Sequence, residues 1–90
     1  MTAEVQWAEA RAADACQAAY FRDALVGERQ VVADNLAEAH AQLRECLENE
    51  KVVGLGGVAR SRFKVRVLEQ QQRELDRMIT ALDRRFTAAR

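Results

Sequence analysis

The sequence lacks proline and has only four glycines in 90 residues. Proline and glycine are the residues that most often interrupt a helix, so long stretches of this chain can be helical without a break. Serine and histidine each occur once. Nucleophilic and acid–base catalysis need such residues in close combination, so the sequence indicates a protein that is not an enzyme.

The sequence also offers few residues that could form a metal or cofactor site. Cys16 and Cys46 would lie ~45 Å apart on one helix, too far for a disulfide, and we expect two reduced, small core residues of a cytoplasmic protein. His40 stands between alanines with no second ligand at metal spacing, which predicts a surface residue. No apolar run is long enough to cross a membrane, and the polar start is unlike a signal peptide. We predict no metal, no cofactor and no membrane association.

A glycine cluster divides the chain into two arms of opposite charge. Three of the four glycines lie within residues 54–57. Residues 1–50 carry four arginines against ten acidic residues, a net charge of −6, whereas residues 51–90 carry ten basic residues against four acidic ones, a net charge of +6. We predict one all-α domain, a long antiparallel helical hairpin of coiled-coil type. Its first arm covers 3–50, its turn 51–60 and its second arm 61–89, with Ser61 as the helix cap.

Gly27 leaves the first arm open to two interpretations. A glycine inside one continuous helix costs about 1 kcal/mol and is tolerated. A break at Gly27 would instead give a three-helix bundle, although Glu28, Arg29 and Gln30 offer no capping side chain for a new helix.

The second arm carries a regular apolar seam. Its members alternate at spacings of three and four, as the inner positions of a coiled coil do. They are Val65, Leu68, Gln72, Leu75, Ile79, Leu82 and Phe86. Gln72 is either a tolerated polar position or a residue that sets register.

The arms differ in length, and this predicts association. Folded back, the second arm covers roughly residues 24–50, so the first twenty or so residues protrude. Trp7, Tyr20 and Phe21 are then uncovered anchors for another molecule. We expect a homo-oligomer or a place in a larger protein assembly.

A basic run follows the first arm. It consists of Lys51, Arg60, Arg62, Lys64 and Arg66, with no acidic residue between its ends. It is either a solvated turn or a surface for an anionic partner, whether phosphates or an acidic protein face. The net charge of zero makes nucleic acid the less expected partner, reachable only through this turn.

Two families resemble this region. The stretch Leu55–Arg66 is similar to the turn and recognition helix of a helix-turn-helix repressor. Small head–tail connector proteins of tailed bacteriophages resemble residues 36–86: Val53–Gly57 matches their glycine-containing hairpin, and Ser61-Arg62 matches the start of their second helix. Val65, Leu68 and Leu75 match its inner face. The connector resemblance implies a ring-forming structural protein between portal and tail, located in the virion.

Together these features predict a non-enzymatic structural or adaptor protein that works by helix-mediated oligomerisation. The most specific prediction is a phage-type head–tail connector. A coiled-coil assembly factor or antitoxin-like protein is one alternative, and a DNA-binding regulator that uses the basic turn is another.

Overall fold

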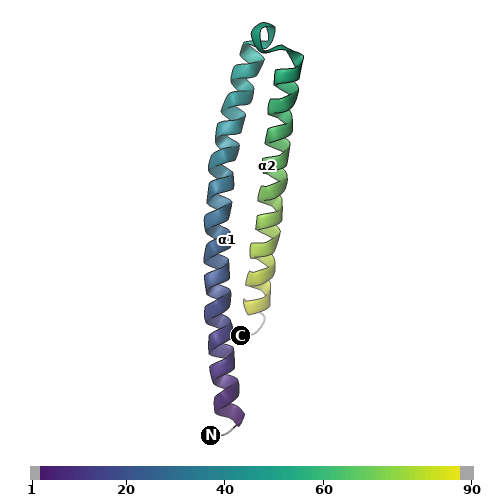
Figure 1. Ribbon diagram of the computed structural model, residues 1–90. Helices are drawn as coiled ribbons and strands as arrows, with labels where there is room; N and C mark the ends of the chain where they lie inside the picture. Colours follow the sequence, from purple (N-terminus) through teal and green to yellow (C-terminus); the bar gives the residue numbers. More distant parts are fainter. Residues whose placement is uncertain (1–2, 88–90) are drawn as a thin grey trace.

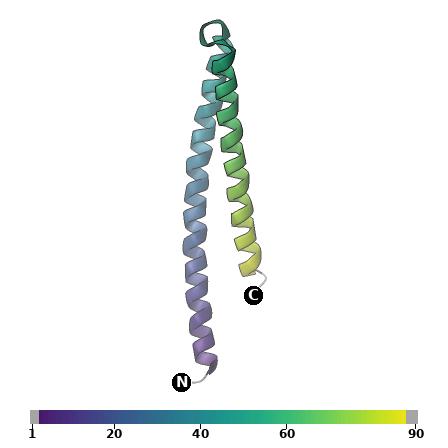
Figure 2. The same ribbon diagram turned by 45° about the vertical axis from the view of Figure 1, so that its right-hand side comes forward.

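The computed structural model describes residues 3–87, and they form two long helices side by side (Figure 1). Helix α1 spans Ala3–Glu48 and helix α2 spans Glu50–Thr87. The two helices run antiparallel and stay adjacent when the molecule is turned (Figure 2). The molecule is a rod of 75 × 16 × 16 Å, so the prediction of an all-α helical hairpin is confirmed.

Helix α1 continues through Gly27 without a break. A Cβ built at this glycine would meet nothing within 4 Å, so neither close packing nor an unusual backbone angle calls for glycine there. Of the two interpretations left open by the sequence, the single long helix is the one observed. The absence of a capping residue after Gly27 is the physical reason, because a new helix start would leave its first amides unsatisfied.

The chain reverses over Asn49–Gly54, earlier and more tightly than the predicted turn of 51–60. The amide nitrogens of Val52 and Val53 both donate to the Asn49 carbonyl, at 2.9 and 3.0 Å. Gly54 then takes φ 77° and ψ 172°, the only positive φ in the described chain. Glycine adopts this region freely and other residues do not, so Gly54 completes the reversal and directs the part of α2 that follows it.

The prediction that Ser61 caps the second helix is wrong. Residues 55–60, predicted as turn, are helical, and Ser61 lies inside α2 with its Oγ 3.3 Å from Cys46 Sγ. Gly57 is buried, and a Cβ there would overlap the Val53 side chain. Glycine at this position therefore permits close packing at the hairpin's tip and does not form a turn.

The core is a thin layer between the helices. Five apolar residues are buried: Val32, Ala39, Val58, Val65 and Ile79. Of the predicted seam, Val65 and Ile79 are buried, while Leu68, Gln72, Leu75 and Leu82 are half-buried. The side chain of Phe86, the last seam position, falls outside the described part, as do Ala88 and Ala89 at the end of the predicted second arm.

Candidate interaction surfaces

Two ion pairs between the helices show which residues of α1 and α2 lie opposite each other. Arg22 Nε donates to Asp83 Oδ1 at 2.7 Å, and Arg29 Nη1 donates to Asp76 Oδ1 at 3.3 Å. The hydrogen bond from Arg22 holds the pKa of Asp83 below its usual value of 3.8 and raises the pKa of Arg22. These four side chains are about half exposed, so each pair adds little stability but marks the register.

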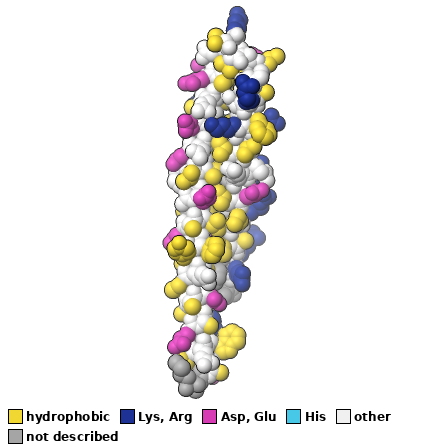
Figure 3. Space-filling view, in the orientation of Figure 1, with side chains coloured by type: hydrophobic (Ala, Val, Ile, Leu, Met, Phe, Trp, Pro, Cys, Tyr) yellow, Lys and Arg dark blue, Asp and Glu magenta, His cyan; other side chains and the backbone are white. Residues whose placement is uncertain are grey.

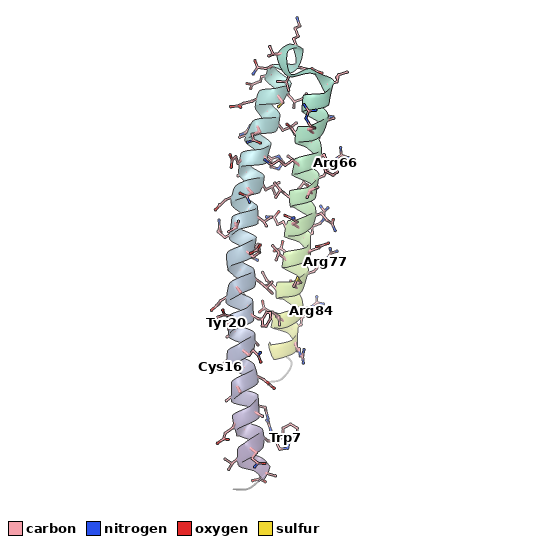
Figure 4. The ribbon with its side chains drawn as sticks, viewed as in Figure 1. Trp7, Cys16, Tyr20, Arg66, Arg77 and Arg84 are labelled. Carbon is pink, nitrogen blue, oxygen red and sulfur yellow. The ribbon has the colours of Figure 1, made fainter. Side chains whose placement is uncertain are left out.

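The outer surface of α2 carries a row of arginines, which we call the arginine edge. Its members are Arg62, Arg66, Arg73, Arg77 and Arg84, all exposed. Their spacings of 4, 7, 4 and 7 return to the same side of a helix. Figure 4 shows Arg66, Arg77 and Arg84 projecting from α2 on the side away from α1.

The outer surface of α1 carries acidic residues at a similar spacing, which we call the acidic edge. Its members opposite the length of α2 are Asp23, Asp34, Glu38 and Glu45, all exposed. Their spacings of 11, 4 and 7 again return to one side of the helix. Arg22 and Arg29 instead face α2, so these two arginines do not neutralise the acidic edge.

The two edges lie on opposite sides of the rod. In Figure 3 the lysine and arginine side chains gather along the α2 side, and most acidic side chains lie along the α1 side. The segregation of charge between the arms, visible in the sequence, therefore becomes a segregation across the width of the molecule.

A third surface is apolar and runs along both helices on the face seen in Figure 3. The hydrogen bond from Lys64 Nζ to Gln42 Oε1 at 3.4 Å crosses this face. Helical spacing places these exposed residues on or beside it: Phe21, Val31, Phe63, Val67 and Met78. A shallow recess lined by Asp14, Gln17, Ala18, Phe21, Leu82 and Arg85 continues it near the end of α2.

The predicted basic run does not form one surface. Lys51, Arg60, Arg62, Lys64 and Arg66 are all exposed. On a helix, however, residues two apart point in nearly opposite directions and residues four apart share a face. Arg62 and Arg66 therefore belong to the arginine edge, whereas Arg60 and Lys64 lie on the other side of α2.

The predicted anchors are exposed but separate. Trp7 is 65% exposed, Tyr20 76% and Phe21 57%. Tyr20 and Cys16 lie on the outer side of α1, whereas Trp7 points to the side of α1 on which α2 packs (Figure 4). Because Cys16 is exposed, the prediction that it is a core residue is wrong; Cys46 is half-buried, and both cysteines are free.

The arginine edge is not apparent from proximity along the sequence. Arg73, Arg77 and Arg84 were outside the basic run, which was defined by proximity along the chain. The signal was present in the 4, 7, 4, 7 spacing of the arginines over 62–84. It is recognisable only when the whole stretch is treated as one helix.

Within residues 3–87, no group of three or more histidine, cysteine or carboxylate side chains could hold a metal ion. His40 is exposed. The helices that the structure describes include none long and apolar enough to span a membrane.

Comparisons with protein-family models, with curated proteins and with solved structures give no match for this chain. A function for this chain must therefore be inferred from its own residues and surfaces.

Proposed function

We propose that this protein is a non-enzymatic structural or adaptor protein that works by helix-mediated oligomerisation. The observation that supports the proposal is the large surface left exposed. The chain exposes 7259 Å². A compact folded monomer of this mass exposes about 5,300 Å² by the usual scaling of area with mass.

The excess, roughly 2,000 Å², is more than the ~800 Å² that each partner contributes to a standard protein interface. The exposed surface includes large apolar side chains from both helices, such as Tyr20, Val31 and Phe63. A two-helix rod leaves most of each helix surface without a neighbour, and further copies of the chain or a larger partner would cover it.

Sedimentation velocity over a range of micromolar concentrations tests this proposal. We expect a mass well above the 10.1 kDa of one chain, rising with concentration. A strictly monomeric protein that unfolds cooperatively at every concentration would remove the argument, because the hairpin would then need no partner.

The particular assembly that we propose is a head–tail connector of a tailed bacteriophage, present in the cytoplasm before assembly and in the virion afterwards. Its support is the sequence resemblance over residues 36–86 and the extended, association-prone shape. The hairpin implied at Val53–Gly57 is not formed, because that stretch is helical except at Gly54. Genes for portal, capsid and tail proteins beside the coding gene would support this assembly, and a gene without phage neighbours would count against it.

A further inference from the structure

We infer that the acidic edge of one copy docks on the arginine edge of a second copy, with the two hairpins side by side and pointing in the same direction. This inference rests on the proposed function and names the partner and the surfaces. The first observation is the separation of charge across the rod. One edge carries Asp23, Asp34, Glu38 and Glu45, and the opposite edge carries five arginines.

The two edges have the same length. Glu45 and Asp23 are separated by 22 positions, and so are Arg62 and Arg84, which corresponds to about 33 Å along a helix. An acidic row and a basic row of equal length can pair from end to end, and of the five arginines only Arg77 then has no acidic edge residue at its height.

The charges also lie at matching heights along the rod. Arg22 faces Asp83 and Cys46 faces Ser61, so one residue forward on α1 corresponds to one residue back on α2. By this alignment, four edge pairs lie within about two residues, or ~3 Å, of the same height: Asp23 with Arg84, Asp34 with Arg73, Glu38 with Arg66, and Glu45 with Arg62. A second copy moved sideways by one rod width, without sliding, brings each acid beside an arginine.

Intramolecular contacts do not use up these charges. Among the described residues, the hydrogen-bond partners of the edge side chains are neutral amides: Gln30 donates to Asp34 at 3.0 Å, and Arg73 donates to Gln70 at 2.9 Å. An arginine guanidinium binds a carboxylate through two parallel hydrogen bonds, which gives such pairs geometric specificity. Two copies related by a two-fold axis along the rod would instead bring like edges together, which repel.

The same-direction arrangement has a second physical support. It places α1 of one copy antiparallel to α2 of the next, which is how these helices already pack within the hairpin. Antiparallel neighbours bring the opposite ends of their helix dipoles together. Each copy would then have one free edge of each sign, so the contact can repeat into a row or close into a ring.

Charge reversal on each edge tests the inference by sedimentation velocity. One variant carries Asp34→Arg and Glu38→Arg, and the other carries Arg66→Glu and Arg73→Glu. We expect each alone to associate at least about tenfold more weakly than the wild type, and a mixture of the two to associate again, since each retains one intact edge. A control variant carrying Glu4→Arg and Glu28→Arg, which has the same net charge change as the acidic-edge variant but at positions away from that edge, should associate as the wild type does.

The outcomes separate this inference from the proposed function. Assembly that persists unchanged in both edge variants would overturn the edge contact while leaving oligomerisation intact. A monomeric wild type would overturn the proposed function itself. Recovery of association in the mixture also shows that the edge variants are folded, and loss without recovery would contradict the inference when circular dichroism shows native helix content.

Fluorescence resonance energy transfer between dyes attached to neighbouring copies tests whether the copies point in the same direction. The label site is Ala8→Cys in a background with Cys16→Ala and Cys46→Ala. Copies that point the same way would hold their labels about one 16 Å rod width apart and give strong transfer. Copies that point opposite ways would hold them near opposite ends of a 75 Å rod, and weak transfer would overturn the same-direction arrangement.

Discussion

Gly54→Ala should destabilise the hairpin, because the reversal over Asn49–Gly54 ends in a backbone conformation that favours glycine. Gly54 has φ 77° and ψ 172°, a region that side chains with a Cβ almost never enter. A Cβ at Gly54 would meet no atom within 4 Å, so the substitution adds no clash. The whole effect should come from backbone strain, which costs about 1–3 kcal/mol.

Gly27→Ala is the matched control. A Cβ at Gly27 also meets nothing within 4 Å, but Gly27 has ordinary helical geometry in the middle of α1. The same chemical change should therefore stabilise the protein by up to about 1 kcal/mol, the difference in helix propensity between glycine and alanine. The two substitutions differ only in the backbone conformation of the site, so their difference of about 2–4 kcal/mol isolates that conformation.

Thermal unfolding followed by circular dichroism at 222 nm measures both effects. Each kcal/mol shifts the Tm of a domain of this size by about 4–8 °C. All three proteins must be compared at one concentration, because association raises Tm by mass action. A Tm for Gly54→Ala equal to or above that of the wild type would refute the reasoning, since the reversal would not then depend on a positive φ.

Two further predictions concern the contact between the helices. Ile79→Ala should destabilise the hairpin by about 2–5 kcal/mol, because Ile79 is only 5% exposed. Gln71→Ala, at an exposed position, should change the free energy of unfolding by no more than about 0.5 kcal/mol. Equal urea midpoints for the two variants would contradict the packing of the seam. The lowered pKa of Asp83 means that its pair with Arg22 contributes stability above the usual pKa of 3.8 and loses it as pH falls through the lower folded-state value. Urea unfolding between about pH 5 and 2 should show a smaller acid-induced loss for Asp83→Asn than for the wild type, and equal losses would show that the pair does not form in solution.

The helical hairpin follows directly from the composition. With no proline and one isolated glycine before residue 54, the first arm had no strong signal that would end a helix. The reversal could be placed only at the glycine cluster. Which glycine takes the positive φ was not predictable, because Gly54, Gly56 and Gly57 are equally free of a Cβ. In the structure Gly54 takes the positive φ, whereas glycine is needed at Gly57 because the Val53 side chain occupies the space beside it.

The surfaces were less predictable than the fold, because they depend on where the second helix begins. The basic run forms one surface only if residues 51–60 are a loop, because neighbours in the sequence of a loop are also neighbours in space. Once residues 55–66 are helical, neighbouring basic residues separate onto two sides of α2. Expecting the second helix to begin at residue 61 thus predicted a basic surface that does not form. The same expectation left the arginine edge unrecognised, because that edge is defined by helical spacing.

The first part of α1 extends beyond α2, and this supports the proposed role in association. Residues 3–17 lie beyond Thr87, the described end of α2, by the register of the Arg22–Asp83 pair. An isolated helix of about 15 residues is marginal in water, and the six alanines of this stretch favour it without burying much area. Trp7 nevertheless lies on the same side of α1 as the buried Val32 and Ala39, so the face that packs against α2 continues into this stretch and remains exposed. A partner that covers Trp7 would extend the core of the hairpin along the rest of α1.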